Sequence, residues 1–190
     1  MTIQAVVFDC FGVICVGARG YAVSQCPAPL RPRLDELFDQ ADYGYISADE
    51  FIAQAAQLMS IKSGEFQAML DARYARDETM VDMVRSLRQH YKTALLSNAN
   101  NAIIRRLFTP QELGELFSDV IISSEVGMVK PHPELFELAA TRLDCLPEEC
   151  VMVDDVALNI DGAIQVGMKG IVFTNNQQCV RELQEMGVNA

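Results

Sequence analysis

The chain has 190 residues, half of them apolar and 22% charged, which is ordinary globular composition and excludes a disordered chain. Its 26 acidic and 15 basic residues give a net charge of −11 without a basic cluster, which argues against a nucleic-acid partner. No apolar run approaches the roughly 18 residues that cross a bilayer, and the N-terminus lacks the basic region of a signal peptide, so we expect no membrane partner.

Short apolar runs rich in Val, Ile and Leu recur along the chain and predict the strands of a parallel sheet. Runs of this length that alternate with helical stretches are typical of a sheet buried on both faces. We therefore predict an α/β fold built on a doubly wound parallel sheet. The runs are residues 5–8, 93–96, 151–153 and 171–173, with 120–122 as a weaker fifth.

The stretch from about 16 to 76 has a different pattern, with helical periodicity and no convincing strand. Ser47 and Glu50 form a capping box that predicts a helix start, flanked by Ile46 and Phe51 as a hydrophobic staple. We predict a small helical bundle inserted between the first and second strands. The predicted organisation is an α/β core over 1–15 and 77–190 and a helical unit over 16–76.

Polar side chains follow three of the predicted strands directly. Asp9 ends the first, Ser97 and Asn98 end the second, and Asp154 and Asp155 end a later one. In open parallel sheets, ligands bind in the crevice beyond the carboxyl ends of the strands. These residues are therefore expected to meet at one edge and form the functional site.

Two adjacent carboxylates at a buried strand end repel each other unless a cation offsets them. Mg²⁺ takes oxygen ligands of this kind, and Asp9 as a third carboxylate favours a metal site over the alternative, in which one Asp caps a helix and the other faces solvent. Ser97 and Asn98 suit an anion at a helix start, although Ser97 alone is more typical of a helix N-cap. Lys130 would balance charge and hold phosphate oxygens if it lay beside these acids.

The six cysteines include no Cys-x-x-Cys pair, and the chain has only two histidines, so a zinc site is not expected. Cys10 and Cys15 lie in an apolar run that is typical of a core. Reduced thiols in a cytoplasmic protein are the simplest interpretation.

Four segments of the sequence, taken in chain order, resemble the four motifs of the haloacid dehalogenase superfamily. The resemblance spans essentially the whole chain. The segments are Val7–Val13, Leu95–Asn98, Lys130–Pro131 and Val153–Ala163. The helical stretch is similar to the small cap of the superfamily's first cap type, inserted in a Rossmann-like core. Ser97 to Asn100 and the Asp pair followed by Asn159 look most like sugar-1-phosphate phosphatases and the N-terminal phosphatase domain of soluble epoxide hydrolase.

The resemblance implies a Mg²⁺-dependent hydrolase that removes phosphate from a small phosphorylated metabolite through an aspartyl-phosphate. In that scheme Asp9 is the nucleophile and Lys130 its catalytic partner. Ser97, Asn98 and Lys130 hold the substrate's phosphate. The Mg²⁺ ligands are Asp9, the main-chain carbonyl of Phe11 and Asp155, with Asp154 as a neighbour or a water-mediated ligand. The oligomeric state is not predicted.

Phe11 departs from the family pattern. Most phosphatases of the superfamily carry a second Asp there as general acid and base, and a phenyl ring cannot protonate a leaving group. An aromatic residue at this place favours the alternative of a metal-free 2-haloacid dehalogenase, which the paired acids oppose. Two further alternatives are a phosphonoacetaldehyde hydrolase with Lys62 as a Schiff base and a catalytically impaired binding module. Candidates for substrate contact in the helical stretch are Arg19, Arg31, Arg33, Tyr43 and Tyr45.

Overall fold

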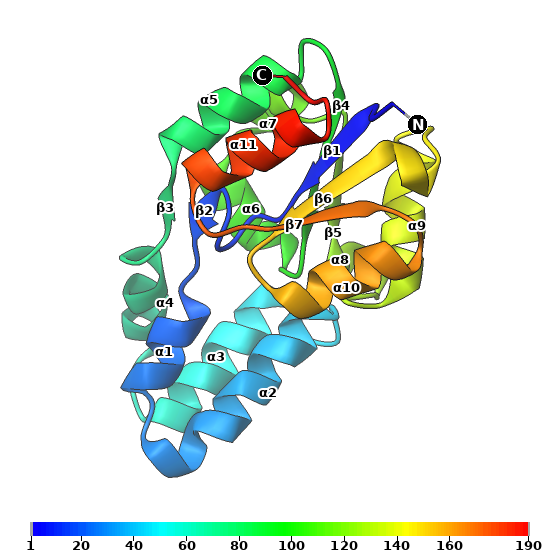
Figure 1. The fold of residues 1–190 in the computed structure, drawn as a ribbon. Helices are drawn as coiled ribbons and strands as arrows, with labels where there is room; N and C mark the ends of the chain where they lie inside the picture. The colour runs from blue at the N-terminus through cyan, green and yellow to red at the C-terminus, as the bar shows by residue number, and fades with distance from the viewer. Residues whose placement is uncertain (1, 190) are drawn as a thin grey trace.

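A five-stranded parallel sheet forms the centre of the protein, as seen in a computed structural model that describes residues 2–189 (Figure 1). The strand order is β5-β4-β1-β6-β7, and every neighbouring pair is parallel. The predicted α/β fold is confirmed, and the weak run at 120–122 is a strand. The strands are β1 (Ala5–Phe8), β4 (Lys92–Ser97), β5 (Asp119–Ile122), β6 (Cys150–Asp154) and β7 (Lys169–Val172).

Helices cover both faces of this sheet. Because successive strand residues point to opposite faces, Val6 and Phe8 enter one apolar layer while Ala5 and Val7 enter the other. Both layers consist of buried apolar side chains, which explains why the central strands are continuous apolar runs. Helices α5 (Glu78–Leu87), α6 (Asn101–Leu107), α7 (Pro110–Leu116) and α11 (Asn176–Glu185) pack on the first layer, and α9 (Pro133–Arg142) and α10 (Ala157–Gln165) on the second.

Between residues 16 and 75 the chain makes four α-helices that pack around a third cluster of buried residues, beside one end of the sheet (Figure 1). Aromatic contacts stabilise this cluster: the ring centroid of Phe51 lies 4.7 Å from that of Phe38 and 5.8 Å from that of Phe66. The predicted capping box at Ser47 and Glu50 is present. We call these helices the insertion: α1 (Arg19–Gln25), α2 (Arg31–Asp42), α3 (Ala48–Met59) and α4 (Ser63–Asp71), with a 3₁₀ turn at Ala28–Leu30.

A short antiparallel ribbon connects the insertion to the rest of the chain. Strand β2 (Cys15–Val16) pairs with β3 (Ala75–Arg76). The Arg76 guanidinium anchors the ribbon through an ion pair of 2.7 Å with Glu112 and through the face of the Phe108 ring. The expectation that residues 16–76 contain no strand is wrong at these two ends, because two residues are too few to produce a periodic pattern.

Two smaller elements complete the chain: helix α8 (Ser123–Val126) follows β5, and a 3₁₀ turn at Pro147–Glu149 precedes β6. Within residues 2–189, no helix has both the length and the apolarity that a membrane span requires. All six cysteines are free, as the prediction of reduced thiols requires.

Candidate active site

The carboxyl ends of the three central strands bring the predicted polar residues to one edge of the sheet. Asp9 follows β1 directly, Ser97 ends β4 and Asp154 ends β6. Asp9 is 7% exposed, while Ser97 and Asp154 are fully buried. Polar groups this deep are retained only when they are paired or bind something. The edge is therefore a built site and not an incidental group of surface residues.

Lys130 joins two of these carboxylates. Its Nζ lies 2.8 Å from Asp9 Oδ1 and 2.6 Å from Asp154 Oδ2, and the lysine is almost fully buried. Burial lowers the pKa of Lys130, but the two carboxylates outweigh burial and raise it overall. Burial raises the pKa of Asp9 to about 7, against the opposing effect of Lys130. The lysine is thus a fixed positive charge beside a carboxylate that carries an energetic penalty for being charged.

The position of Lys130 is set by Asn98 and by a glycine. The Asn98 side chain accepts a hydrogen bond from the Lys130 backbone N–H at 2.8 Å and donates one to the Lys130 carbonyl at 3.0 Å. A Cβ on Gly162 of α10 would come within 2.5 Å of the Pro131 carbonyl oxygen, so only glycine lets α10 pack this closely. The side-chain amide of Asn98 therefore holds the loop that carries Lys130. The backbone N–H of Asn98 takes no part in these two hydrogen bonds and can serve a ligand.

Asp154 and Asp155 are adjacent but differently engaged. Asp154 accepts hydrogen bonds from Lys130 Nζ, from the Val156 backbone N–H and from the Asn159 side-chain amide. No side chain among residues 2–189 pairs with the Asp155 carboxylate, and burial followed by repulsion from Asp154 raises its pKa. A carboxylate with a raised pKa and free lone pairs is the one that a cation would stabilise most.

The carboxylates of Asp9, Asp154 and Asp155 each offer an oxygen, and these oxygens lie within 4.8 Å of one another. Gly12 completes this corner. Its φ is +91°, and a Cβ there would lie 2.2 Å from Asp155 Oδ2. Glycine is therefore required in the loop after β1 for two reasons: the backbone angle and the space that Asp155 occupies.

Ser97 has a buried hydroxyl with no hydrogen-bond partner among residues 2–189. The interpretation of this serine as a helix N-cap is wrong: α6 begins at Asn101, and its N-cap is Asn100, whose side chain accepts from the Ile103 backbone N–H. Three residues of loop separate Ser97 from the helix, so its hydroxyl cannot reach the helix start. An unpartnered hydroxyl in a polar site is typical of a position that a ligand fills.

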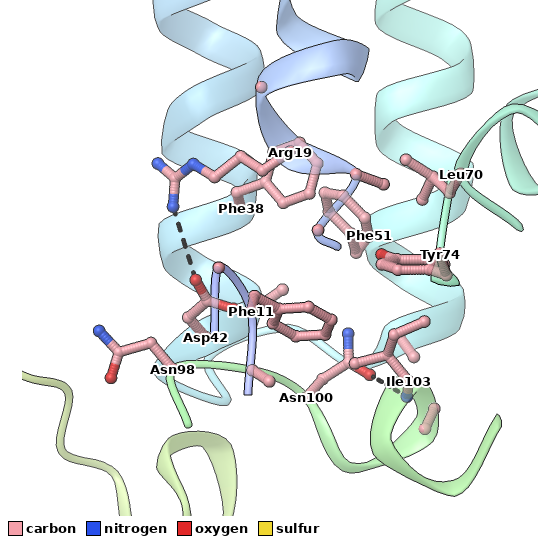
Figure 2. Close-up of a pocket in the computed structure, with 18 of the residues that line it drawn as sticks. Phe11, Arg19, Phe38, Asp42, Phe51, Leu70, Tyr74, Asn98, Asn100 and Ile103 are labelled. Atoms are coloured by element: carbon pink, nitrogen blue, oxygen red, sulfur yellow. Dashed lines mark hydrogen bonds and ion pairs between the residues drawn. The ribbon is translucent and has the colours of Figure 1, made fainter. Parts of the chain in front are cut away.

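A cavity of about 500 Å³ lies between this edge and the insertion. The sheet edge lines this cavity with Asp9, Asn98, Lys130 and Asp155. Figure 2 shows aromatic side chains of the insertion facing into it, with the Phe11 ring 5.8 Å from the Tyr74 ring. Apolar lining residues from the side of the insertion are Phe38, Phe51, Ile52, Leu70 and Tyr74, while Ile103 of α6 lines the cavity from the core.

Four polar residues of the insertion line the cavity together with these apolar residues: Arg19, Asp42, Asp49 and Gln67. Asp42, the last residue of α2, points toward Arg19 of α1, and Oδ2 of the carboxylate lies 3.5 Å from the guanidinium Nη1 (Figure 2). Arg19 also pairs with Asp35 at 3.0 Å and with Asp39 at 2.7 Å. Its charge is thus offset mainly by Asp35 and Asp39, which lie closer to it than Asp42 does.

The sequence analysis identified only part of the cavity lining that the insertion supplies. Of the five insertion residues suggested for substrate contact, Arg19 lines the main cavity, and Tyr43 lines a smaller one beside it. Arg31, Arg33 and Tyr45 line neither. Lys62 is exposed at the start of α4 and lines neither cavity, which removes the support for a Schiff base. Asp42 and the aromatic residues were missed because no local motif marks them.

Comparison with known proteins accounts for this arrangement. The sequence profile of the haloacid dehalogenase-like hydrolases matches residues 3–167. The chain belongs to this family of hydrolases. The match includes every residue of the sheet edge described above, from Asp9 to Asn159. The resemblance inferred from the motifs is therefore confirmed at the level of the family.

This hydrolase resembles several curated proteins. It is 28% identical to D-ribitol-5-phosphate phosphatase of Bacteroides thetaiotaomicron, over 95% of this chain and 97% of that protein. It is 35% identical to bifunctional epoxide hydrolase 2 of Mus musculus, but this match covers 40% of this chain and only 14% of that protein.

Solved structures show the same fold. A predicted haloacid dehalogenase-like family hydrolase from Porphyromonas gingivalis superposes with a TM-score of 0.81 at 20% identity, over the full length of both chains. A family enzyme from Bacteroides thetaiotaomicron, in complex with magnesium and inorganic phosphate, superposes with 0.76 at 21% identity, over 90% of this chain and 94% of that one. L-2-haloacid dehalogenase from Xanthobacter autotrophicus reaches 0.62 at 20% identity, over 97% and 83%.

Proposed function

We propose that this hydrolase is a Mg²⁺-dependent phosphatase that acts on a small phosphorylated metabolite, for which a sugar phosphate is one candidate. The observation that carries the proposal is the pairing of a buried lysine with two carboxylates, beside a buried hydroxyl that has no partner. Asp9 and Lys130 supply a nucleophile and a fixed cation, and the Ser97 hydroxyl is free to donate to a phosphate oxygen. The similarity to phosphatases over nearly the whole chain supports the same function.

The donor atoms suit a magnesium ion. Mg²⁺ binds through oxygen ligands, commonly one or two carboxylates together with water and substrate phosphate. We assign Asp9, the main-chain carbonyl of Phe11 and Asp155 as the groups that would hold it, because Asp154 already accepts hydrogen bonds at both oxygens. When bound, the ion would neutralise charge on the phosphoryl group and lower the energetic penalty of charged Asp9 and Asp155.

The chain's own residues then carry the reaction. An Asp9 carboxylate oxygen attacks phosphorus in line, and an aspartyl-phosphate forms as the leaving oxygen departs. Lys130, Ser97 and the Asn98 backbone N–H hold the phosphoryl oxygens. Because Lys130 lies 2.8 Å from the Asp9 carboxylate, it also aligns that carboxylate for attack. Phosphoryl transfer depends mostly on positioning and charge neutralisation, and these residues supply both.

We further propose that the insertion is a cap, over 16–76, on a core formed by 1–15 and 77–190. The main cavity lies between the two, so residues of the cap would contact the leaving group. The side of this cavity that the insertion forms is largely apolar and aromatic. The two arginines that line the cavity already have acidic partners: Arg19 pairs with three acids, and Arg106 pairs with Asp71 at 2.8 Å. This favours a leaving group without a second negative charge. The cytoplasmic location remains a prediction.

A panel of phosphorylated metabolites, measured with and without Mg²⁺ and with added chelator, tests the proposed function. We expect turnover of phosphomonoesters that is lost on chelation and restored by Mg²⁺. Halide release from 2-haloacids in the presence of chelator would instead establish the dehalogenase alternative. A folded protein that turns over neither class would indicate a binding module.

A further inference from the structure

The site has no acid at the usual place to protonate the leaving group, because Phe11 occupies it. An alkoxide is a poor leaving group, and general acid catalysis contributes roughly 10²–10⁴-fold to such a step. Two carboxylates of the insertion, Asp42 and Asp49, line the main cavity. Among residues 2–189, Asp42 is the one of these two that also lines the smaller cavity, together with Lys130. Its side chain is 19% exposed, so it is largely sheltered yet open to the cavity.

The end of α2 is fixed to the core despite belonging to the insertion. The Asp42 carbonyl accepts a hydrogen bond of 2.5 Å from the Ser123 hydroxyl, which itself accepts from the Ala99 backbone N–H at 2.9 Å. Two residues on, Gly44 has φ +76°, and a Cβ there would lie 2.4 Å from the Ser124 carbonyl oxygen. The backbone of Asp42 is thereby tied to the loop that follows Ser97.

The geometry points to Asp42 as the proton donor to the leaving oxygen, in place of the missing acid at position 11. This inference rests on the proposed phosphatase function and adds a catalytic residue to it. Asp42 lines the cavity from the insertion, whereas Asp9 lines it from the sheet edge, and an in-line leaving group departs on the side away from the nucleophile. The position of Asp42 therefore suits the leaving oxygen in the first step and the attacking water, which enters on the same side, in the second.

The surroundings of Asp42 favour a carboxylic acid over a carboxylate. Burial raises its pKa to about 7, Arg19 and Lys130 oppose this, and Asp39 and Asp9 reinforce it. The last turn of a helix also disfavours an anion. Asp42 therefore stays protonated in a large fraction of molecules near neutral pH. Of the other titratable groups near this end of α2, Asp35 is bound to Arg19, and the Tyr43 hydroxyl lies 3.3 Å from His132 Nε2.

The proton balance closes over one turnover. As the bond between phosphorus and the leaving oxygen breaks, that oxygen takes the proton of Asp42 and departs as an alcohol. The Asp42 carboxylate then takes a proton from the water that attacks the aspartyl-phosphate. The bond between phosphorus and Asp9 breaks, inorganic phosphate leaves, and Asp42 is again protonated.

The variant Asp42→Asn tests this role through its dependence on the leaving group. Ethyl phosphate needs a proton on its leaving oxygen, whereas 4-nitrophenyl phosphate does not. With ethyl phosphate we expect kcat to fall roughly 10²–10⁴-fold. With 4-nitrophenyl phosphate we expect a stopped-flow burst of nitrophenol at the wild-type rate, followed by slow turnover, since only the water-activating step is lost.

Asp39→Asn is the matched control, because Asp39 lies one turn earlier on α2, also pairs with Arg19, and is exposed. It should keep both rates near those of the wild type. A nitrophenol burst rate that falls in Asp42→Asn as much as kcat for ethyl phosphate would overturn the inference. So would no loss on either substrate, or the same selective loss in Asp39→Asn. If Asp42→Asn does not fold, the wild-type pH profile decides: kcat for ethyl phosphate should fall above pH 7 while the nitrophenol burst rate does not. Identical profiles would overturn it. Wild-type protein that hydrolyses neither ester would instead refute the proposed function.

Discussion

In two regions of the molecule a single cationic side chain pairs with several acidic side chains, once in a buried site and once in a partly exposed one. At the sheet edge, Lys130 is held by two carboxylates and its side chain is 1% exposed. In the insertion, Arg19 is held by three carboxylates and its side chain is 41% exposed. Buried charges cannot be rescued by solvent when a partner is lost, whereas exposed pairs contribute little to stability. Changes to the Lys130 cluster are therefore expected to lower stability more than changes to the Arg19 cluster.

The strongest test of the sheet edge is Asp9→Asn, which keeps the shape and removes the nucleophile. We expect the phosphatase activity to fall by at least about 10³-fold, because an amide cannot form the acyl-phosphate. Circular dichroism and thermal unfolding should show a folded protein, since Lys130 keeps Asp154 as a partner. Activity within tenfold of the wild type would show that Asp9 is not the nucleophile.

The two clusters differ most sharply in stability when the cation is removed. Lys130→Met leaves two buried carboxylates uncompensated and should lower the free energy of unfolding by about 3–5 kcal/mol. Arg19→Met removes a partly exposed cation and should change it by about 1 kcal/mol or less. Urea unfolding of both variants at neutral pH measures the contrast. Equal losses would contradict the argument from burial.

The pH dependence of stability separates Asp42 from its exposed neighbours. Its pKa is about 7 in the folded protein, above the ordinary value of 3.8, so folding favours the protonated form and stability falls as pH rises between these values. Asp42→Asn should therefore match the wild type at pH 4 and be more stable at pH 8, by about 4 kcal/mol at most. Melting curves across this range test it, with Asp39→Asn as the control that should not show the effect.

The smallest expected effect concerns the glycine beside Asp155. Gly12→Ala places a methyl group against the Asp155 carboxylate at a φ of +91°, which should cost about 1–2 kcal/mol of stability. If Asp155 binds Mg²⁺, its displacement should weaken the apparent Mg²⁺ affinity by roughly tenfold or more. Gly64→Ala is the control: nothing lies within 4 Å of that position in α4, so it should stabilise slightly and leave Mg²⁺ activation unchanged. Unaltered Mg²⁺ activation in Gly12→Ala would count against Asp155 as a ligand.

The sheet edge was predictable from sequence because its residues are attached to strands. A carboxylate that directly follows a buried strand can only emerge at the carboxyl end, so Asp9 and Asp154 are placed as soon as β1 and β6 are recognised. The wall of the insertion follows no such rule. Asp42 enters the cavity only because Gly44 and the Ser123 hydroxyl fix the end of α2 against the core, and those contacts join residues far apart in the chain. The alternative of a helix N-cap at Ser97 failed for a related reason, since α6 starts only at Asn101 and takes Asn100 as its N-cap.

The ribbon of β2 and β3 has a consequence for how such a molecule can diversify. The chain leaves for the insertion at Val16 and returns at Ala75, and these residues are paired neighbours. The helices between them form a segment that starts and ends at neighbouring positions. The length and the sequence of this segment can therefore change without displacing a strand of the parallel sheet. An ancestral gene could exchange the entire wall that faces the leaving group while inheriting the reaction centre intact. Selection on substrate range and selection on chemistry would then act on separate stretches of one reading frame.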